Sequence, residues 1–235
     1  PTGKRLILVG DPDQLPPVGP GFPFGDMLRS GSLPTVRLTE IFRQAQKSLI
    51  VMNAHRVNQG QMPDLKCVSS DFFFMRRNSE EAVCTLIRDL CATRLPKNMG
   101  IPTDQIQVLS PTRKGAVGTV NLNRLLQAAL NPPSPDKKER SYGDYQFREG
   151  DRVMQIRNNY DILWKKPDGS AVGAGIFNGD VGRIQTIDPA SETLTVLFDD
   201  RLAEYDFTQL GELEPAYAMT VHKSQGSEYR AVILA

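Results

Sequence analysis

The 235-residue sequence has few of the residues that build disulfide scaffolds and metal centres. It contains three cysteines, Cys67, Cys84 and Cys91, with no Cys-x-x-Cys pair, and only two histidines. We therefore expect buried, reduced thiols and no metal site. No apolar run approaches the roughly 18 residues that a membrane span needs, and no signal peptide is recognisable. These absences favour a cytoplasmic protein without a membrane partner.

A strong excess of charge of one sign is also absent. The sequence has 28 Lys and Arg residues against 27 Asp and Glu residues, a formal net charge of +1. This balance neither requires nor excludes a nucleic acid, and any basic surface has to be local. No segment matches the phosphate loop G-x-x-x-x-G-K-[ST]. We therefore expect this chain alone neither to bind ATP tightly nor to hydrolyse it.

Apolar runs and helical spacing predict an α/β fold with a parallel sheet in the first part of the chain. The predicted strands are residues 6–9, 35–38, 71–77 and 106–110, and the predicted helices are residues 24–28, 44–58, 80–95 and 116–130. Asn78-Ser79-Glu80-Glu81 resembles a capping box at the start of one of these helices.

The pattern changes after residue 130. Residues 131–145 are rich in proline and charge, which predicts a linker or an exposed loop. Short strands separated by Asn-Gly-Asp, Asp-Pro and Asp-Asp turns follow over residues 147–213 and predict a small β barrel. Residues 216–226 are predicted to be helical, and residues 231–235 form an apolar strand. The β barrel is therefore an insertion in the α/β domain.

The loop Gly10-Asp-Pro-Asp-Gln-Leu-Pro-Pro-Val-Gly19 follows the first predicted strand. Its prolines fix φ and stiffen the loop. Polar groups at the carboxyl end of a strand are typical of ligand sites in α/β sheets. A second candidate is Arg43 in Leu38-Thr-Glu-Ile-Phe-Arg-Gln44, because a permanently charged guanidinium stabilises the charge on a transferring phosphoryl group.

Two later segments combine hydroxyls and cations. Ser110-Pro-Thr-Arg-Lys-Gly115 follows a predicted strand and suits a phosphodiester. The positive end of the helix predicted to begin near Ala116 adds to this. Ala216-Tyr-Ala-Met-Thr-Val-His-Lys-Ser-Gln-Gly-Ser-Glu-Tyr229 supplies further short donors and one lysine. Taken singly, each segment is also compatible with an ordinary loop, a helix cap or solvated charges.

Taken together and in this order, these segments resemble the motifs of RecD-like superfamily 1 DNA helicases, the 5′-to-3′ group that includes the exodeoxyribonuclease V alpha subunit. The resemblance covers nearly the whole chain. Residues 147–161 and 177–182 are similar to the SH3-like subdomain of that family. The family's first two motifs and its final motif are missing, so we expect a C-terminal motor fragment.

The resemblance implies a RecA-like parallel-sheet motor domain with an inserted SH3-like β barrel. Residues 1–36 would form the C-terminal edge of a first motor domain. Residues 37–146 and 214–235 would form the second motor domain, and residues 147–213 the insert.

The resemblance also implies two groups of site residues. Gln14 would sense the terminal phosphate and Arg43 would be an arginine finger, which makes both catalytic. Gln225, Gly226 and Glu228 would join them in binding the nucleotide. The implied DNA-binding residues are Thr112, Arg113, Lys114, Thr220, His222, Lys223 and Ser224.

The function implied is part of an ATP-dependent helicase that translocates on single-stranded DNA and unwinds duplex. ATP and Mg²⁺ would be cofactors of the full-length protein, with none bound in this fragment, which we expect to be inactive alone. Further partners would be recombination or repair subunits.

Two alternatives remain open: a non-catalytic nucleic-acid-binding module, and the motor segment of a conjugative relaxase. The insert holds cations beside aromatic residues, which form either a strip for stacking and phosphates or core and solvated surface. These residues are Arg148, Arg152, Arg157, Lys165, Lys166, Tyr160 and Trp164.

Overall fold

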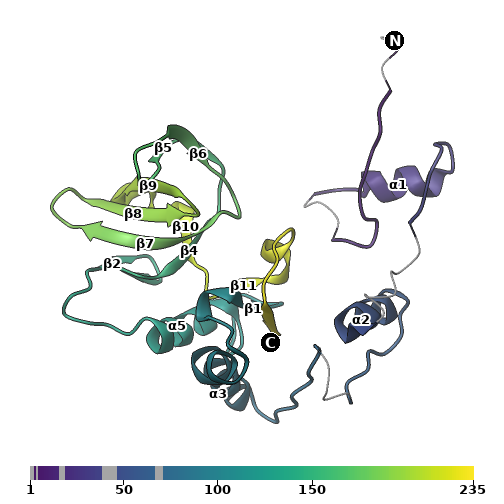
Figure 1. Ribbon diagram of the computed structural model, residues 1–235, viewed down its shortest axis with the longest axis horizontal. Coiled ribbons are helices and arrows are strands. Elements are labelled where there is room, and N and C mark those ends of the chain that lie inside the picture. Colours follow the sequence, from purple (N-terminus) through teal and green to yellow (C-terminus); the bar gives the residue numbers. More distant parts are fainter. Residues whose placement is uncertain (1–2, 4, 16–18, 39–46, 67–70) are drawn as a thin grey trace. The chain divides into compact units, whose positions relative to one another are not determined.

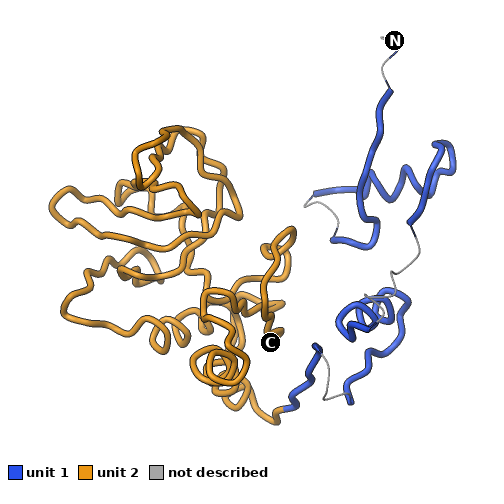
Figure 2. Tube along the Cα trace, viewed as in Figure 1, with its two compact units in different colours: residues 1–76 blue, residues 77–235 orange. Residues whose placement is uncertain are grey.

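The computed structural model describes the chain except for residues 1–2, 4, 16–18, 39–46 and 67–70. The chain forms two compact units, residues 1–76 and residues 77–235 (Figure 2). Among the residues described, no helix has the length and apolar character needed to cross a membrane.

Unit 1 contains the helices α1 (Pro23–Ser30) and α2 (Leu49–Asn58) (Figure 1). Ser48 caps α2, because its hydroxyl accepts a hydrogen bond from the Val51 N–H at 3.2 Å. Asn53 is buried and bonds both backbone groups of Asp64, at 2.7 and 3.1 Å. Both helices were predicted, although α1 is longer than the predicted residues 24–28 and α2 begins at Leu49 instead of residue 44; residues 44–46 lie outside the described residues.

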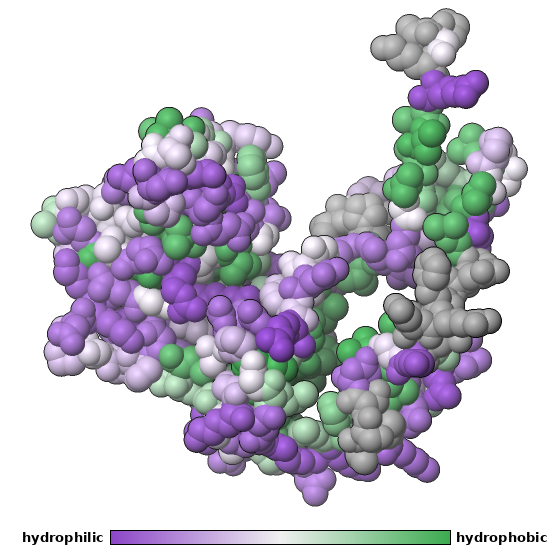
Figure 3. All heavy atoms as spheres, viewed as in Figure 1, coloured by the Kyte–Doolittle hydropathy of each residue, from purple (hydrophilic) through white to green (hydrophobic). Residues whose placement is uncertain are grey.

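The three strands predicted in the region up to residue 77 do not form. Leu6 and Val9 are 82% and 93% exposed, and this extended N-terminal segment is hydrophobic surface in Figure 3. A strand needs a neighbour for its ladder of hydrogen bonds. The described residues of unit 1 supply no such neighbour, so the prediction of a buried strand at residues 6–9 was wrong for this chain.

A parallel sheet organises the α/β part of unit 2, whose residues 77–235 are all described. Its order is β11 (Ala218–Thr220), β1 (Ile106–Ser110) and β12 (Ala231–Leu234), with both pairs parallel. The prediction of a parallel sheet and of its strands at residues 106–110 and 231–235 is confirmed. The prediction of a helix over residues 216–226 was wrong, because residues 218–220 pair with β1 and only Val221–Ser224 form a 3-10 helix.

The helices of unit 2 pack on this sheet through one hydrophobic core. Helix α3 (Glu80–Asp89) is capped by Ser79 and continues through a π-helical turn (Leu90–Arg94) into α4 (Leu95–Met99). Helix α5 spans Thr119–Leu130. The fully buried core residues include Ile87, Val108, Leu122 and Leu126.

Two of the three cysteines lie in that core. Cys84 and Cys91 are buried free thiols, as predicted, and burial raises the pKa of Cys91 to about 12. Cys67 lies outside the described residues.

The inserted β region is a seven-stranded antiparallel sheet in the order β10-β4-β7-β8-β9-β5-β6, counted within residues 77–235. Its strands are β4 (Arg152–Gln155), β5 (Asn159–Lys165), β6 (Val172–Ile176), β7 (Val181–Asp188), β8 (Thr193–Phe198), β9 (Arg201–Asp206) and β10 (Leu213–Pro215). The prediction of a closed barrel was wrong, because the end strands β10 and β6 do not pair. Alternating hydrophobicity predicts strands, but it does not show whether the two end strands of a sheet pair with each other.

Residues 131–145 are more ordered than predicted. Strands β2 (Glu139–Tyr142) and β3 (Tyr145–Arg148) form a hairpin beside the sheet. The prediction of a linker was therefore wrong in its second half, where cross-strand pairing orders a charged sequence.

The junction between the insert and the α/β part is short and polar. Strand β10 leads to β11 through Ala216 and Tyr217, both buried. The Tyr217 hydroxyl donates to the buried carboxylate of Asp151 at 3.0 Å, and Gln127 of α5 and Asn131, the residue after α5, donate to the same carboxylate. The carboxylate of Asp151 therefore joins the insert to α5 and to the segment between β10 and β11.

Candidate functional site

The carboxyl ends of β1 and β11 lie side by side. The two strands run parallel and Ser110 stands opposite Thr220. The loop after β1 carries residues 112–114, and the 3-10 helix after β11 carries residues 221–224. Both segments therefore leave the same edge of the sheet, which brings together the two groups predicted to bind DNA although about a hundred residues separate them.

Local hydrogen bonds hold the loop after β1. The hydroxyl of Ser110 donates to the Val117 carbonyl at 2.8 Å and accepts from the Thr112 N–H at 3.3 Å. A Cβ atom on Gly118 would lie 2.4 Å from the Lys114 carbonyl oxygen. The loop backbone therefore passes too close to position 118 for any side chain there.

The start of α5 differs from the prediction. The helix begins at Thr119, and the N–H groups of Thr119 and Val120 donate to the carbonyls of Thr112 and Arg113, at 3.0 and 3.2 Å. These are two of the free N–H groups with which a helix start binds an anion. The helix therefore begins three residues later than predicted, and the loop itself uses two of its first N–H donors; the contribution of the helix start to phosphate binding stays a prediction.

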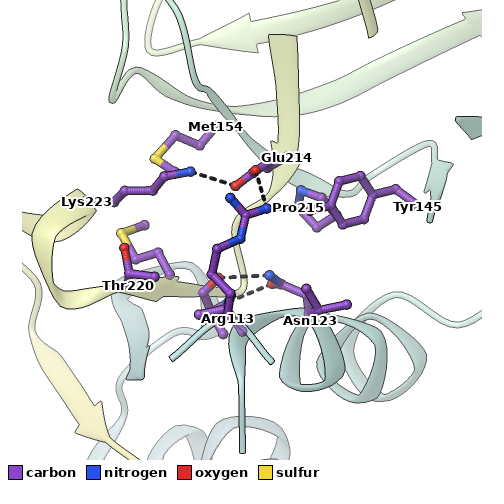
Figure 4. Close-up of a pocket in the computed structure, with 12 residues that line it drawn as sticks. Arg113, Asn123, Tyr145, Met154, Glu214, Pro215, Thr220 and Lys223 are labelled. Atoms are coloured by element: carbon purple, nitrogen blue, oxygen red, sulfur yellow. Dashed lines mark hydrogen bonds and ion pairs between the residues drawn. The ribbon is translucent and has the colours of Figure 1, made fainter. Parts of the chain in front are cut away.

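A glutamate that the motifs did not indicate links the two basic segments. Glu214 of β10 accepts from Arg113 Nη2 at 2.9 Å with one oxygen and from Lys223 Nζ at 2.6 Å with the other (Figure 4). The negative charge of Glu214 raises the pKa of Arg113. Tyr145 of β3 places its hydroxyl 3.5 Å from the Arg113 guanidinium, and burial raises the pKa of this tyrosine.

The segment after β11 is a tight polar turn. The Ser224 hydroxyl donates to the Val221 carbonyl at 2.8 Å, and His222 is exposed. Gly226 has a φ of +81°, a conformation that favours glycine. Gln225 and Glu228, the neighbours of this glycine predicted to face the nucleotide, are exposed.

Asn123 fixes β11 from the helix side. This buried residue of α5 donates to the Ala218 carbonyl at 2.9 Å and accepts from the Ala218 N–H at 2.7 Å. These bonds engage both backbone groups of Ala218, the first residue of β11. Asn123 therefore positions the strand that carries Thr220.

The space between the basic side chains is small. A pocket of about 10 Å³ is lined in part by Arg113, Tyr145, Glu214, Thr220 and Lys223. This is room for about one water molecule. The site therefore offers a surface for an extended ligand and does not enclose a nucleotide.

The residues predicted to bind the nucleotide are divided between the two units. Gln14 lies in unit 1, where its side-chain amide lies 3.4 Å from a carboxylate oxygen of Asp11. Gln225, Gly226 and Glu228 lie in unit 2. Arg43 lies outside the described residues.

The basic strip considered for the insert is interrupted. Arg148 is buried and paired with Glu139 at 2.5 Å. Arg152 donates to the Ile106 carbonyl at 3.2 Å and lies over the ring of Tyr229. These two arginines hold the fold together, so they do not extend the strand-end surface.

Sequence reasoning missed three residues that shape the site: Glu214, Asn123 and Gly118. A buried asparagine on an otherwise apolar helix face is a signal that could have indicated Asn123. Glu214 and Gly118 carry no signal in one sequence, because their roles depend on which loops meet.

Comparison with known proteins identifies three family models along the chain. An AAA domain model matches residues 1–71, an "ATP-dependent RecD-like DNA helicase SH3 domain" matches residues 122–198, and a "UvrD-like helicase C-terminal domain" matches residues 215–235. The last match contains the segment that forms β11 and the polar turn.

Two curated relatives align over nearly all of this chain. The ATP-dependent RecD2 DNA helicase of Deinococcus radiodurans is 34% identical over 240 residues, which is 99% of this chain and 29% of that protein. An uncharacterized protein of Methanocaldococcus jannaschii is 28% identical over 293 residues, 98% of this chain and 24% of that protein. The chain thus spans less than a third of either relative.

Among solved structures, unliganded Pif1 from Bacteroides sp. matches with 14% identity and a TM-score of 0.30, over 55% of this chain and 45% of that one. This TM-score is too low to indicate a shared fold. The sequence matches confirm the resemblance that the motifs indicated: the chain belongs to the RecD-like DNA helicases.

Proposed function

We propose that the chain supplies the single-stranded-DNA-contacting edge of an ATP-dependent helicase motor, which translocates on one strand and unwinds duplex. The observation that carries the proposal is the parallel register of β1 and β11, which sets Ser110 opposite Thr220. Basic and hydroxyl side chains after both strands then face one ligand. Phosphates are bound in this way by short donors and cations at strand ends.

In the full-length protein we infer that ATP and Mg²⁺ supply the energy of translocation through phosphoryl transfer. Gln14, Arg43, Gln225 and Glu228 would contact the nucleotide. The fit rests on Gly226, whose φ of +81° and missing side chain allow close approach of a phosphate to the backbone. The RecA-like architecture of the motor and the domain limits given above belong to the same proposal.

The DNA part is tested by binding of a fluorescent single-stranded oligonucleotide to the full-length protein. Arg113→Ala and Lys223→Ala are each expected to weaken binding and to reduce the slope of log K against log salt by about 0.7, the value for one phosphate contact on a single strand. Lys97→Ala, a matched change at an exposed lysine of α4, is expected to leave both quantities unchanged. Equal binding by all three variants would refute the proposal.

The motor part is tested by ATP hydrolysis in the full-length protein. Arg43→Ala is expected to abolish DNA-stimulated hydrolysis while ATP binding is retained. Normal turnover in this variant rejects the arginine-finger role. A wild-type protein that binds DNA without any DNA-stimulated hydrolysis would instead have the function of a non-catalytic module.

A further inference from the structure

The position of Glu214 raises a question about the cations proposed to bind DNA. Both Arg113 and Lys223 already have a counter-ion, and it is the same carboxylate, with one oxygen for each cation. The glutamate side chain is only 15% exposed, whereas Arg113 is 56% exposed. The carboxylate therefore lies beneath the surface, and the guanidinium remains accessible to a ligand from outside.

The backbone around these residues makes the carboxylate the fixed partner. Glu214 is the central residue of β10 and pairs with Met154 of β4. Arg113 lies in a loop, and Lys223 lies in a one-turn 3-10 helix. The cations can move away on their long side chains, while the glutamate is held by the sheet of the insert.

We propose that Glu214 is an internal counter-ion that competes with a DNA phosphate for Arg113 and Lys223, and that binding of the DNA backbone requires exchange of at least one of these ion pairs. This inference rests on the proposed DNA-binding function and adds a regulatory element to it. The three charges sum to +1. The site therefore attracts a phosphate with a net charge of +1, whereas the two cations alone would attract it with +2. Such a site releases its phosphate readily, which suits a protein that has to move along a strand.

The exchange predicts that loss of the Glu214 charge strengthens DNA binding, whereas a purely structural role of Glu214 predicts weaker binding. Glu214→Gln removes the charge and keeps the size of the side chain, so it raises the local charge to +2. We expect tighter binding of a single-stranded oligonucleotide at low salt and a slope of log K against log salt that is steeper by about 0.7. The ratio of variant to wild-type affinity then falls about fivefold for a tenfold increase in salt. Glu204→Gln, the same change at an exposed position of β9, controls for net charge.

A double variant distinguishes charge from folding. Lys223→Met leaves Glu214 with Arg113 alone, so the local charge is zero and binding is expected to weaken. Adding Glu214→Gln restores a charge of +1, and binding is expected to return to about the wild-type value. The affinities are measured in the full-length protein by fluorescence anisotropy, and thermal unfolding of each variant is recorded beside them.

The outcomes separate the two proposals. If the double variant binds no better than Lys223→Met, or if Glu214→Gln weakens binding, Glu214 is a structural anchor and the exchange is refuted. If Lys223→Met and Arg113→Ala both bind like the wild type, the DNA-binding function itself is refuted. Recovery in the double variant together with a steeper salt slope in Glu214→Gln supports the exchange.

Discussion

Gly118→Ala tests whether the shape of the loop after β1 is required for binding. The backbone at position 118 has φ −73° and ψ 155°, which alanine adopts without strain. The added methyl group would nevertheless lie 2.4 Å from the Lys114 carbonyl oxygen and 2.6 Å from that of Arg113. The loop backbone must therefore move away from the helix start.

The cost follows from the bonds that this movement breaks. The N–H groups of Thr119 and Val120 lose their acceptors, the carbonyls of Thr112 and Arg113. At about 0.5 to 1.5 kcal/mol for each hydrogen bond, we expect the free energy of unfolding to fall by about 1 to 3 kcal/mol in urea denaturation. Because Arg113 moves with the loop, affinity for a single-stranded oligonucleotide is expected to fall as well.

The control is Gly143→Ala at the tip of the β2–β3 hairpin. This glycine has φ +55° and no atom within 4 Å of an added Cβ. It is expected to lose about 1 to 2 kcal/mol through backbone strain alone and to keep its DNA affinity. If Gly118→Ala leaves both stability and DNA binding at the wild-type values, the steric reasoning about the loop is refuted.

Three further predictions concern the elements that support the site. Asn123→Ala removes both hydrogen bonds to Ala218 and is expected to lower stability by about 1 to 3 kcal/mol and to weaken DNA binding; unchanged binding would show that β11 holds its position without the asparagine. Ile187→Ala leaves a cavity in the fully buried core of the insert and is expected to cost about 2 to 5 kcal/mol in urea unfolding, so a loss below 1 kcal/mol would contradict the packing. Burial raises the pKa of Asp151 above its ordinary value of 3.8. The folded state then holds this proton at a pH where the unfolded state has lost it, so the free energy of unfolding should fall as the pH rises from about 3.8 through the raised pKa. Asp151→Asn is expected to lack this fall, and to be about 2 to 4 kcal/mol less stable at pH 7 because its amide faces donors. Parallel pH curves for wild type and variant would exclude the assignment.

The sequence predicted helices in both units and two of the three strands of the parallel sheet. The strand at residues 106–110 and the helix at residues 116–130 appear close to their predicted limits, because apolar spacing and a buried core favour the same structure there. Residues 6–9 are equally apolar and form no strand among the residues described, because pairing needs a second strand. Local sequence therefore decided the fold only where tertiary contacts agreed with it.

The residues of the candidate site were likewise predicted only in part. The motifs indicated residues 112–114 and 220–224, and the structure places both segments at one sheet edge. Glu214 could not be predicted, because its role arises from a strand of the insert lying beneath two loops of the α/β part. The backbone of β11 bonds the distant residues of β1 and Asn123, whereas the sequence of residues 216–226 by itself favours a helix.

The connection of β10 to β11 through the buried Ala216 and Tyr217 has a consequence for how the chain can be divided. A module attached by flexible linkers can be cut out and leave its host intact. Here the exit from the insert is already part of the host sheet, and Asp151 secures the same place from the other side. Excision of residues 147–213 would remove Asp151, which accepts hydrogen bonds from Gln127, Asn131 and Tyr217. The insert is therefore joined to the sheet edge by a buried backbone connection and by the hydrogen bonds of Asp151, and it is not a separable module.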